Sequence, residues 1–176
     1  SNLRTGQMTS IEILGEALSA ISKYSIKVDS VSTWWVSKPF PIRYGPNYVN
    51  GVIEASSKLM PKEMMSSLKE IEKLAGRKSS GRWRDRILDL DLLSCGDMVL
   101  PTEDIFKKWV SLPLSLQKKM EPKQLILPHP RIQDRLFVLV PLSEVAPNWV
   151  HPFFRKKPQE LIAAANWLEE DLLRPL

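Results

Sequence analysis

The spacing of apolar residues predicts two helices and two strands in the first half of the chain. Apolar side chains recur every three or four residues after Thr9 and predict a helix over residues 9–23. A second helical stripe follows Pro61, a residue suited to a first helical turn. Residues 28–36 and 48–55 are β-prone and predict strands, the first of which ends at a proline-rich turn.

A third strand is predicted over residues 87–94, where leucine alternates with aspartate. The order helix, strand, strand, helix, strand lacks only a leading strand to be βαββαβ. We therefore expect one domain over residues 1–176, an α+β, ferredoxin-like βαββαβ sandwich with C-terminal additions.

The additions are predicted to begin with an irregular segment over residues 97–124, rich in proline and lysine. Residues 135–147 are expected to be helical for part of their length. A final amphipathic helix after Pro158 is expected to carry four apolar residues on one side: Leu161, Ala165, Leu168 and Leu172.

The most informative pattern is the pair Asp89 and Asp91 inside the predicted third strand. Strand side chains alternate between faces, so both carboxylates share one face, about 7 Å apart. Two like charges at that distance favour a shared cation, and magnesium accepts one or two carboxylates together with waters and substrate phosphates. The alternative is an edge strand whose polar face is solvated.

A basic segment precedes this pair. Residues 77–86 hold five cationic side chains, with a glycine and two serines. Arginine matches phosphate oxygens bidentately, so this segment could close over a polyphosphate. The alternative is a solvated loop that binds nucleic acid without specificity.

Composition adds modest limits. The chain has 176 residues, a formal net charge of +5 and 43% hydrophobic residues, which suits a soluble domain with an anionic ligand. Its single cysteine excludes an intramolecular disulfide and a cysteine-based zinc site, and suits a reducing cytoplasm. No apolar run reaches the roughly 20 residues that span a bilayer.

Several ordered motifs resemble those of the 6-hydroxymethyl-7,8-dihydropterin pyrophosphokinases of folate biosynthesis. They are Arg-x-Leu-Asp-Leu-Asp-Leu-Leu at 86–93, Tyr48-x-Asn50, and the block from Leu-Pro-His-Pro-Arg to Ala-Pro at 127–147. The resemblance implies transfer of pyrophosphate from ATP to the hydroxyl of a reduced pterin, release of AMP, a ferredoxin-like fold and two magnesium ions. It also implies small-molecule partners without nucleic acid or membrane, and we expect a monomer.

The resemblance also implies a role for individual residues. Metal binding falls on Asp89 and Asp91, which with Arg77 and Arg86 form the expected catalytic set. Glu72 matches an acidic position of the family, although a solvated helix face explains it as well. The expected ATP-binding residues are Arg77, Arg82, Trp83, Arg86, His129 and Arg135. The expected pterin-binding residues are Ser37, Phe40, Tyr48, Asn50 and Phe137.

The sequence departs from the family pattern in two places. The family's Arg-Trp-Gly-Pro-Arg loop is replaced by Arg-Trp-Arg-Asp-Arg at 82–86, which affects loop closure more than chemistry. The chain opens at Ser1-Asn2-Leu3, which looks like the end of the motif after the family's first strand, so we expect that strand to be missing from this sequence.

Two other functions are compatible with parts of the pattern. An RNA-binding module on a similar sheet would use exposed aromatic and basic residues, but has no need of paired aspartates that repel phosphate. Another metal-dependent nucleotidyl or glycosyl transferase could use the same D-x-D pair. A flat slot formed by Tyr48, Asn50 and Phe137 beside the phosphate site would distinguish the pyrophosphokinase from such a transferase.

Overall fold

The structure, a computed structural model, describes residues 9–39, 46–76, 87–117 and 119–176 and has the α+β composition expected from the sequence. The α-helices are α1 (Ser10–Ile21), α2 (Pro61–Leu74), α3 (Glu103–Val110), α4 (Leu114–Gln117), α5 (Leu136–Val145) and α6 (Pro158–Ala164). The strands are β1 (Ile26–Val31), β2 (Trp35–Ser37), β3 (Tyr48–Asn50), β4 (Ile53–Ser57) and β5 (Arg174–Pro175). None of the helices in these ranges is long and apolar enough to cross a membrane.

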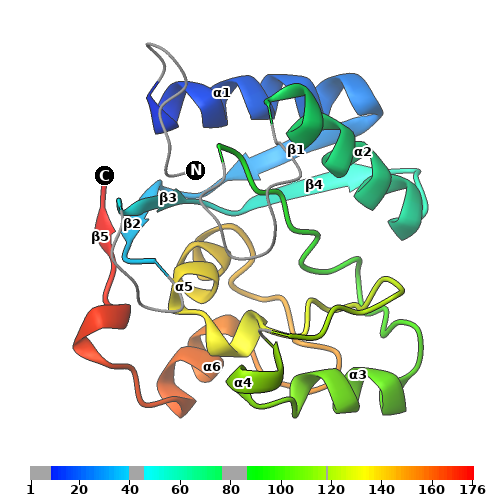
Figure 1. Ribbon diagram of the computed structural model, residues 1–176, viewed down its shortest axis with the longest axis vertical. Helices are drawn as coiled ribbons and strands as arrows, with labels where there is room; N and C mark the ends of the chain where they lie inside the picture. The colour runs from blue at the N-terminus through cyan, green and yellow to red at the C-terminus, as the bar shows by residue number, and fades with distance from the viewer. Residues whose placement is uncertain (1–8, 40–45, 77–86, 118) are drawn as a thin grey trace.

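Helices lie on both sides of the β1–β4 pair, with α1 and α2 together on one side and α5 on the other (Figure 1). One buried cluster joins α1, α2 and β1 and includes Ile13, Ile71 and Leu88. A second cluster joins α5 to α6 and includes Leu139 and Leu161. The β-structure therefore separates two apolar cores, and removal of this apolar surface from water is the main stabilising contribution.

The two helices predicted from the first half of the chain are confirmed. Thr9 is the N-cap of α1, and its backbone N–H donates to Glu12 Oε2 at 2.6 Å. Pro61 is the first residue of α2, and Glu63 accepts a hydrogen bond from the N–H of Met60 at 2.7 Å. Local capping signals therefore set both starting points.

Each of the two strands predicted before α2 is divided in two. β1 and β4 form one antiparallel pair, whereas β2 lies between β3 and β5 in a second antiparallel sheet. The division occurs at Ser32, whose hydroxyl donates to the carbonyl of Thr33 and accepts from the N–H of Val52. The backbone N–H of Ser32 also donates to the carbonyl of Val52 at 2.9 Å, so backbone and side-chain hydrogen bonds together connect these two residues between the two sheets.

The prediction of a strand over residues 87–94 is wrong, because the structure assigns no strand there. The predicted alternation of buried and exposed side chains is nevertheless present. Leu88 and Leu92 are buried whereas Asp89 and Asp91 are exposed. The backbone finds partners outside a ladder: the N–H of Leu90 donates to Glu72 Oε1 at 2.7 Å, and the carbonyl of Leu93 accepts from His129 at 2.7 Å. The segment is extended because it is anchored on both sides by these contacts.

Two predictions for the C-terminal part also need correction. Residues 97–124 contain helices α3 and α4, and the fully buried Phe106 fixes α3 to the rest of the molecule. The final helix α6 stops at Ala164, so Leu168 and Leu172 do not extend its apolar side and are each 60% exposed. After the helix, the indole N–H of Trp167 donates to the carbonyl of Ile162 at 2.8 Å.

Candidate functional site

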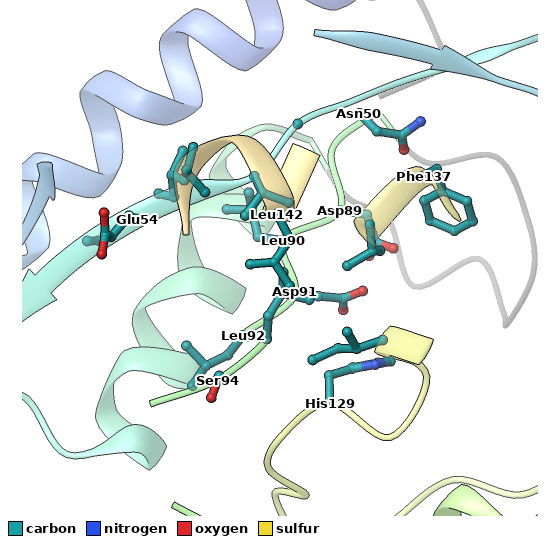
Figure 2. A pocket seen from close by; sticks show the side chains of 18 of the residues that line it. Asn50, Glu54, Asp89, Leu90, Asp91, Leu92, Ser94, His129, Phe137 and Leu142 are labelled. Atoms are coloured by element: carbon teal, nitrogen blue, oxygen red, sulfur yellow. The ribbon is translucent and has the colours of Figure 1, made fainter. Parts of the chain in front are cut away.

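The expected site residues within the described ranges line one cavity of about 690 Å³. Figure 2 shows that they enter it from separate elements: Asn50 from the β3 end, the two aspartates from the extended segment, His129 from a loop and Phe137 from α5. The complete set of these residues is Ser37, Tyr48, Asn50, Asp89, Asp91, His129, Arg135 and Phe137.

The aspartates are held by the extended segment between the two cores. Leu88 and Leu92 anchor this segment in the apolar core, with 1% and 8% of their surface exposed. The alternation of side chains then directs Asp89 and Asp91 away from that core and toward the cavity. The carboxylates are thus presented from a well-anchored backbone.

Glu72 is buried, and the solvated helix face considered for it is wrong. Only 2% of its surface is exposed, and its carboxyl group accepts the hydrogen bond from Leu90, the residue between the two aspartates. The sequence contained a signal for this position, because Glu72 lies four residues after Leu68 and so falls on the apolar side of α2.

A cationic group lies beside the carboxylates. Arg135, at the N-terminus of α5, places its Nη1 at 3.6 Å from Asp91 Oδ2. Its guanidinium carbon also lies 5.7 Å from the centroid of the Phe137 ring, a cation–π distance. Arg135 thereby connects the carboxylate side of the cavity to its aromatic side.

His129 contributes a neutral imidazole. Burial and the nearby charge of Arg135 lower its pKa from 6.5 to about 4, against a smaller opposite effect of Asp91. Its Nδ1 accepts a hydrogen bond from the N–H of Arg131 at 3.2 Å, so the ring proton is on Nε2. At neutral pH the side chain can therefore donate a hydrogen bond without adding a charge.

An amide and aromatic residues form another wall. The Asn50 amide donates from Nδ2 to the Ser37 hydroxyl at 2.9 Å, across paired strands β2 and β3. This bond orients the amide and leaves its carbonyl oxygen as an acceptor. Trp34, which the sequence analysis did not single out, also lines the cavity, and its ring packs so closely on Gly51 that a Cβ there would be 2.5 Å from it.

A second cavity of about 360 Å³ meets the first at Asp91, His129 and Arg135. Its wall includes Trp109 from α3 and Lys123 from the following segment. The 97–124 segment therefore contributes to the wall of a cavity, a feature that its irregular composition did not reveal.

The buried Arg131 joins this segment to the His129 loop. Its guanidinium donates to the backbone carbonyls of Trp109 and Val110 at the end of α3. A cation at a helix C-terminus satisfies carbonyls that have no partner within the helix. This contact holds the wall of the second cavity against the loop that carries His129.

Five expected site residues lie outside the described ranges: Phe40, Arg77, Arg82, Trp83 and Arg86.

The donor set suits magnesium more than a transition metal. Within the described ranges no three histidine, cysteine or carboxylate side chains converge on one point. Asp89 and Asp91 supply two hard oxygen donors at a cavity, and magnesium typically takes one or two carboxylates and fills its shell with water and phosphate oxygens. The residues present therefore fit a metal held jointly by the protein and a phosphate ligand.

Comparison with known proteins shows the family of the chain. The family model of 7,8-dihydro-6-hydroxymethylpterin-pyrophosphokinase (HPPK) matches residues 1–147. The chain belongs to this family. The matched region contains both aspartates, His129, Arg135 and Phe137, and ends just after α5.

Individual relatives are named 2-amino-4-hydroxy-6-hydroxymethyldihydropteridine pyrophosphokinase. The chain is 36% identical to the Synechocystis sp. protein over 137 residues, which cover 78% of this chain and 60% of that relative. It is 32% identical to the Aquifex aeolicus protein, and the match covers 81% of this chain and 78% of that relative. For the Haemophilus influenzae protein the identity is 33%, and the match covers 82% of this chain and 78% of that relative. The match thus spans about three fifths of the Synechocystis protein.

Proposed function

We propose that this protein transfers pyrophosphate from ATP to the hydroxyl of 6-hydroxymethyl-7,8-dihydropterin and releases AMP, a step of folate biosynthesis. The observation that carries this proposal is the meeting of two cavities at Asp91, His129 and Arg135. One cavity has an amide and aromatic wall suited to a flat heterocycle. The other offers space for a nucleotide on the far side of the same charged residues.

In this arrangement the protein acts by positioning and by balancing charge. The pterin hydroxyl oxygen forms a bond to the β-phosphorus of ATP, and the bond from that phosphorus to the α–β bridging oxygen breaks. The bridging oxygen leaves with AMP, and the hydroxyl proton passes to solvent. This substitution needs no nucleophile from the enzyme, only alignment of the two substrates.

The described residues divide these tasks. Arg135 and the Nε2 proton of His129 bind phosphate oxygens, and the neutral state of His129 avoids repulsion with Arg135. Asp89 and Asp91 hold magnesium, for which we propose two ions. Bound magnesium would neutralise phosphate charge and lower the pKa of the attacking hydroxyl.

The pterin is proposed to lie against Phe137 and Tyr48, with Asn50 at its polar edge. The Asn50 amide is oriented by Ser37, so its free carbonyl oxygen can accept from an amino group of the pterin. Phe40, Arg77, Arg82, Trp83 and Arg86 retain the roles implied by the family motifs as part of this proposal.

Several broader features belong to the same proposal. The order of α1, β1, β4, α2 and the extended segment supports a ferredoxin-like arrangement of one domain over residues 1–176. We further propose that the protein acts as a monomer. The single cysteine and a reduced pterin substrate suit a cytoplasmic location.

The test is an assay of AMP release with ATP, magnesium and 6-hydroxymethyl-7,8-dihydropterin. We expect AMP and a pterin diphosphate in equal amounts, identified by mass spectrometry. Release of ADP, or AMP formation that does not depend on the pterin, would contradict the proposed reaction and favour another metal-dependent transferase.

A further inference from the structure

Glu144 joins the last turn of α5 to the beginning of β2. One carboxylate oxygen accepts the backbone N–H of Thr33 at 2.7 Å, and the other accepts the indole N–H of Trp35 at 2.7 Å. These contacts connect residues more than 100 positions apart in the sequence. Both are charge-assisted hydrogen bonds to a single carboxylate, the stronger class of such bonds.

The clamped residues lead directly to the amide wall of the larger cavity. Trp35 is paired with Asn50 in the antiparallel register, and Ser37 is paired with Tyr48. Directly opposed residues on antiparallel strands have their side chains on the same face. The strand that Glu144 holds therefore carries Ser37, which accepts the hydrogen bond of the Asn50 amide.

The same helix supplies the aromatic wall. Phe137 is in the first turn of α5 and lines the cavity directly, while Glu144 is in the last turn and lines neither cavity. Helix α5 thus positions both walls of the cavity. It carries Phe137 on its own backbone, and it holds strands β2 and β3 through the carboxylate of Glu144. The distance between the two walls depends on this connection.

We propose that Glu144 is a positioning residue that sets the width and alignment of the slot for the flat heterocycle. This inference rests on the proposed function, because the slot is the one assigned to the pterin. Glu144 acts through Thr33 and Trp35 and does not touch the substrate. Its loss should affect pterin recognition more than nucleotide binding, since the second cavity is lined by other elements.

The first test compares Glu144→Ala and Glu144→Gln with the wild-type protein in steady-state kinetics. The alanine variant removes both acceptors, whereas glutamine keeps one acceptor oxygen in a side chain of equal length. We expect KM for the pterin to rise about tenfold or more for Glu144→Ala and less for Glu144→Gln, from the usual value of a hydrogen bond to a charged group. KM for ATP should change less than twofold, roughly the noise of such comparisons.

Glu160→Ala is the matched control. Glu160 is also an exposed glutamate that accepts a backbone N–H, from Lys157 at 2.7 Å, but it caps α6 and lines neither cavity. This variant should lower thermal stability through loss of the cap and leave KM for the pterin unchanged. An equal rise in the pterin KM of both variants would reduce Glu144 to a general stabilising role and overturn the inference.

Trp35→Phe tests the clamp by a second route. Phenylalanine keeps an aromatic ring but removes the indole donor. Pterin affinity, measured by calorimetry with a non-hydrolysable ATP analogue, should fall in Trp35→Phe. In the double variant Trp35→Phe with Glu144→Ala, the pterin affinity should fall by less than the product of the two single effects. The reason is that both substitutions remove the same hydrogen bond, from the Trp35 indole to Glu144. Fully multiplicative effects would contradict the clamp.

The indole N–H resonance of Trp35, assigned by its absence in Trp35→Phe, gives a readout that does not depend on activity. It should shift in Glu144→Gln and stay in place in Glu160→Ala. A wild-type protein without pterin-dependent AMP release overturns the proposed function and the role of the slot together. An active wild type whose pterin KM is unchanged by Glu144→Ala overturns only the positioning role.

Discussion

The carboxyl group of Glu72 accepts a hydrogen bond from the backbone N–H of Leu90 at a distance of 2.7 Å. Leu90 separates the two aspartates, so this bond fixes the backbone from which both carboxylates enter the cavity. The acceptor is on α2, and 2% of the Glu72 surface is exposed. A buried helix position therefore determines the geometry of the candidate metal site.

Glu72→Ala is expected to lower the free energy of unfolding by about 1–3 kcal/mol, because the N–H of Leu90 loses its acceptor in a site that water reaches poorly. Activity should fall as well, with a higher requirement for magnesium. Glu72→Gln, which keeps an acceptor oxygen, is the control and should retain more of both properties. Urea denaturation and magnesium titration of AMP release measure these effects. Equal stability of the alanine and glutamine variants would show that the hydrogen bond contributes little to the free energy of unfolding.

Asp91→Ala should reduce turnover on the order of a hundredfold or more at saturating magnesium, because it removes a charged group at the junction of the two cavities. Its contact with Arg135 is long at 3.6 Å and partly exposed, so the expected cost in stability is only about 0–1 kcal/mol. Asp97→Ala is the matched control, since Asp97 is exposed and lines neither cavity. Near-normal turnover in Asp91→Ala would remove this residue from the proposed mechanism.

Asn50→Ala should weaken pterin binding about tenfold or more, because the substrate loses its oriented amide and Ser37 loses a donor. Calorimetry with a non-hydrolysable ATP analogue present measures this change directly. Asn148→Ala provides the comparison: Asn148 bonds Lys157 on the surface and lies outside both cavities. Unchanged pterin affinity in Asn50→Ala would exclude the amide from the slot.

Stability is expected to decrease as the pH falls from 6.5 towards 4, because of His151. This side chain is fully buried, and burial lowers its pKa from 6.5 to about 4. The unfolded chain therefore binds a proton more readily than the folded one in this range, which favours unfolding. Such a pKa shift lowers the free energy of unfolding by up to about 3 kcal/mol once the pH is below both pKa values. Protonation at Nδ1 would also break the hydrogen bonds from Phe153 and Phe154.

Urea denaturation at pH 7 and at pH 4.5 tests this prediction in the wild type and in His151→Asn. Asparagine can keep an acceptor for the two N–H groups but does not titrate. The stability difference between the two pH values should be smaller in the variant, whatever its absolute stability. His129 contributes in the same direction in both proteins, since its pKa is also lowered to about 4. Identical pH dependence would assign the effect to other groups.

Much of the local structure could be predicted because its causes are local. The starts of α1 and α2 depend on caps within three residues, and the alternation of leucine and aspartate at 88–92 follows from the extended backbone itself. The residues of the candidate site could be predicted for the same reason, because the paired aspartates and the ordered motifs are recognisable in the sequence. Their convergence on one cavity could be expected only through the family resemblance.

Other features depend on partners distant in the chain. Whether residues 87–94 form a ladder depends on their neighbours, and the structure gives this segment Glu72 and His129 instead of a paired strand. Strand β5 pairs with β2 across more than 130 residues, a contact that no local pattern indicates.

The sequence alone determined the helical starts, the side-chain alternation and the residue types of the site, since each is set by interactions over a few positions. The tertiary structure alone decided the hydrogen bond from Leu90 to Glu72, the contribution of α3 to the second cavity and the clamp of Glu144 on β2. The physical reason is that burial and long-range hydrogen bonds depend on which surfaces meet after the chain has packed.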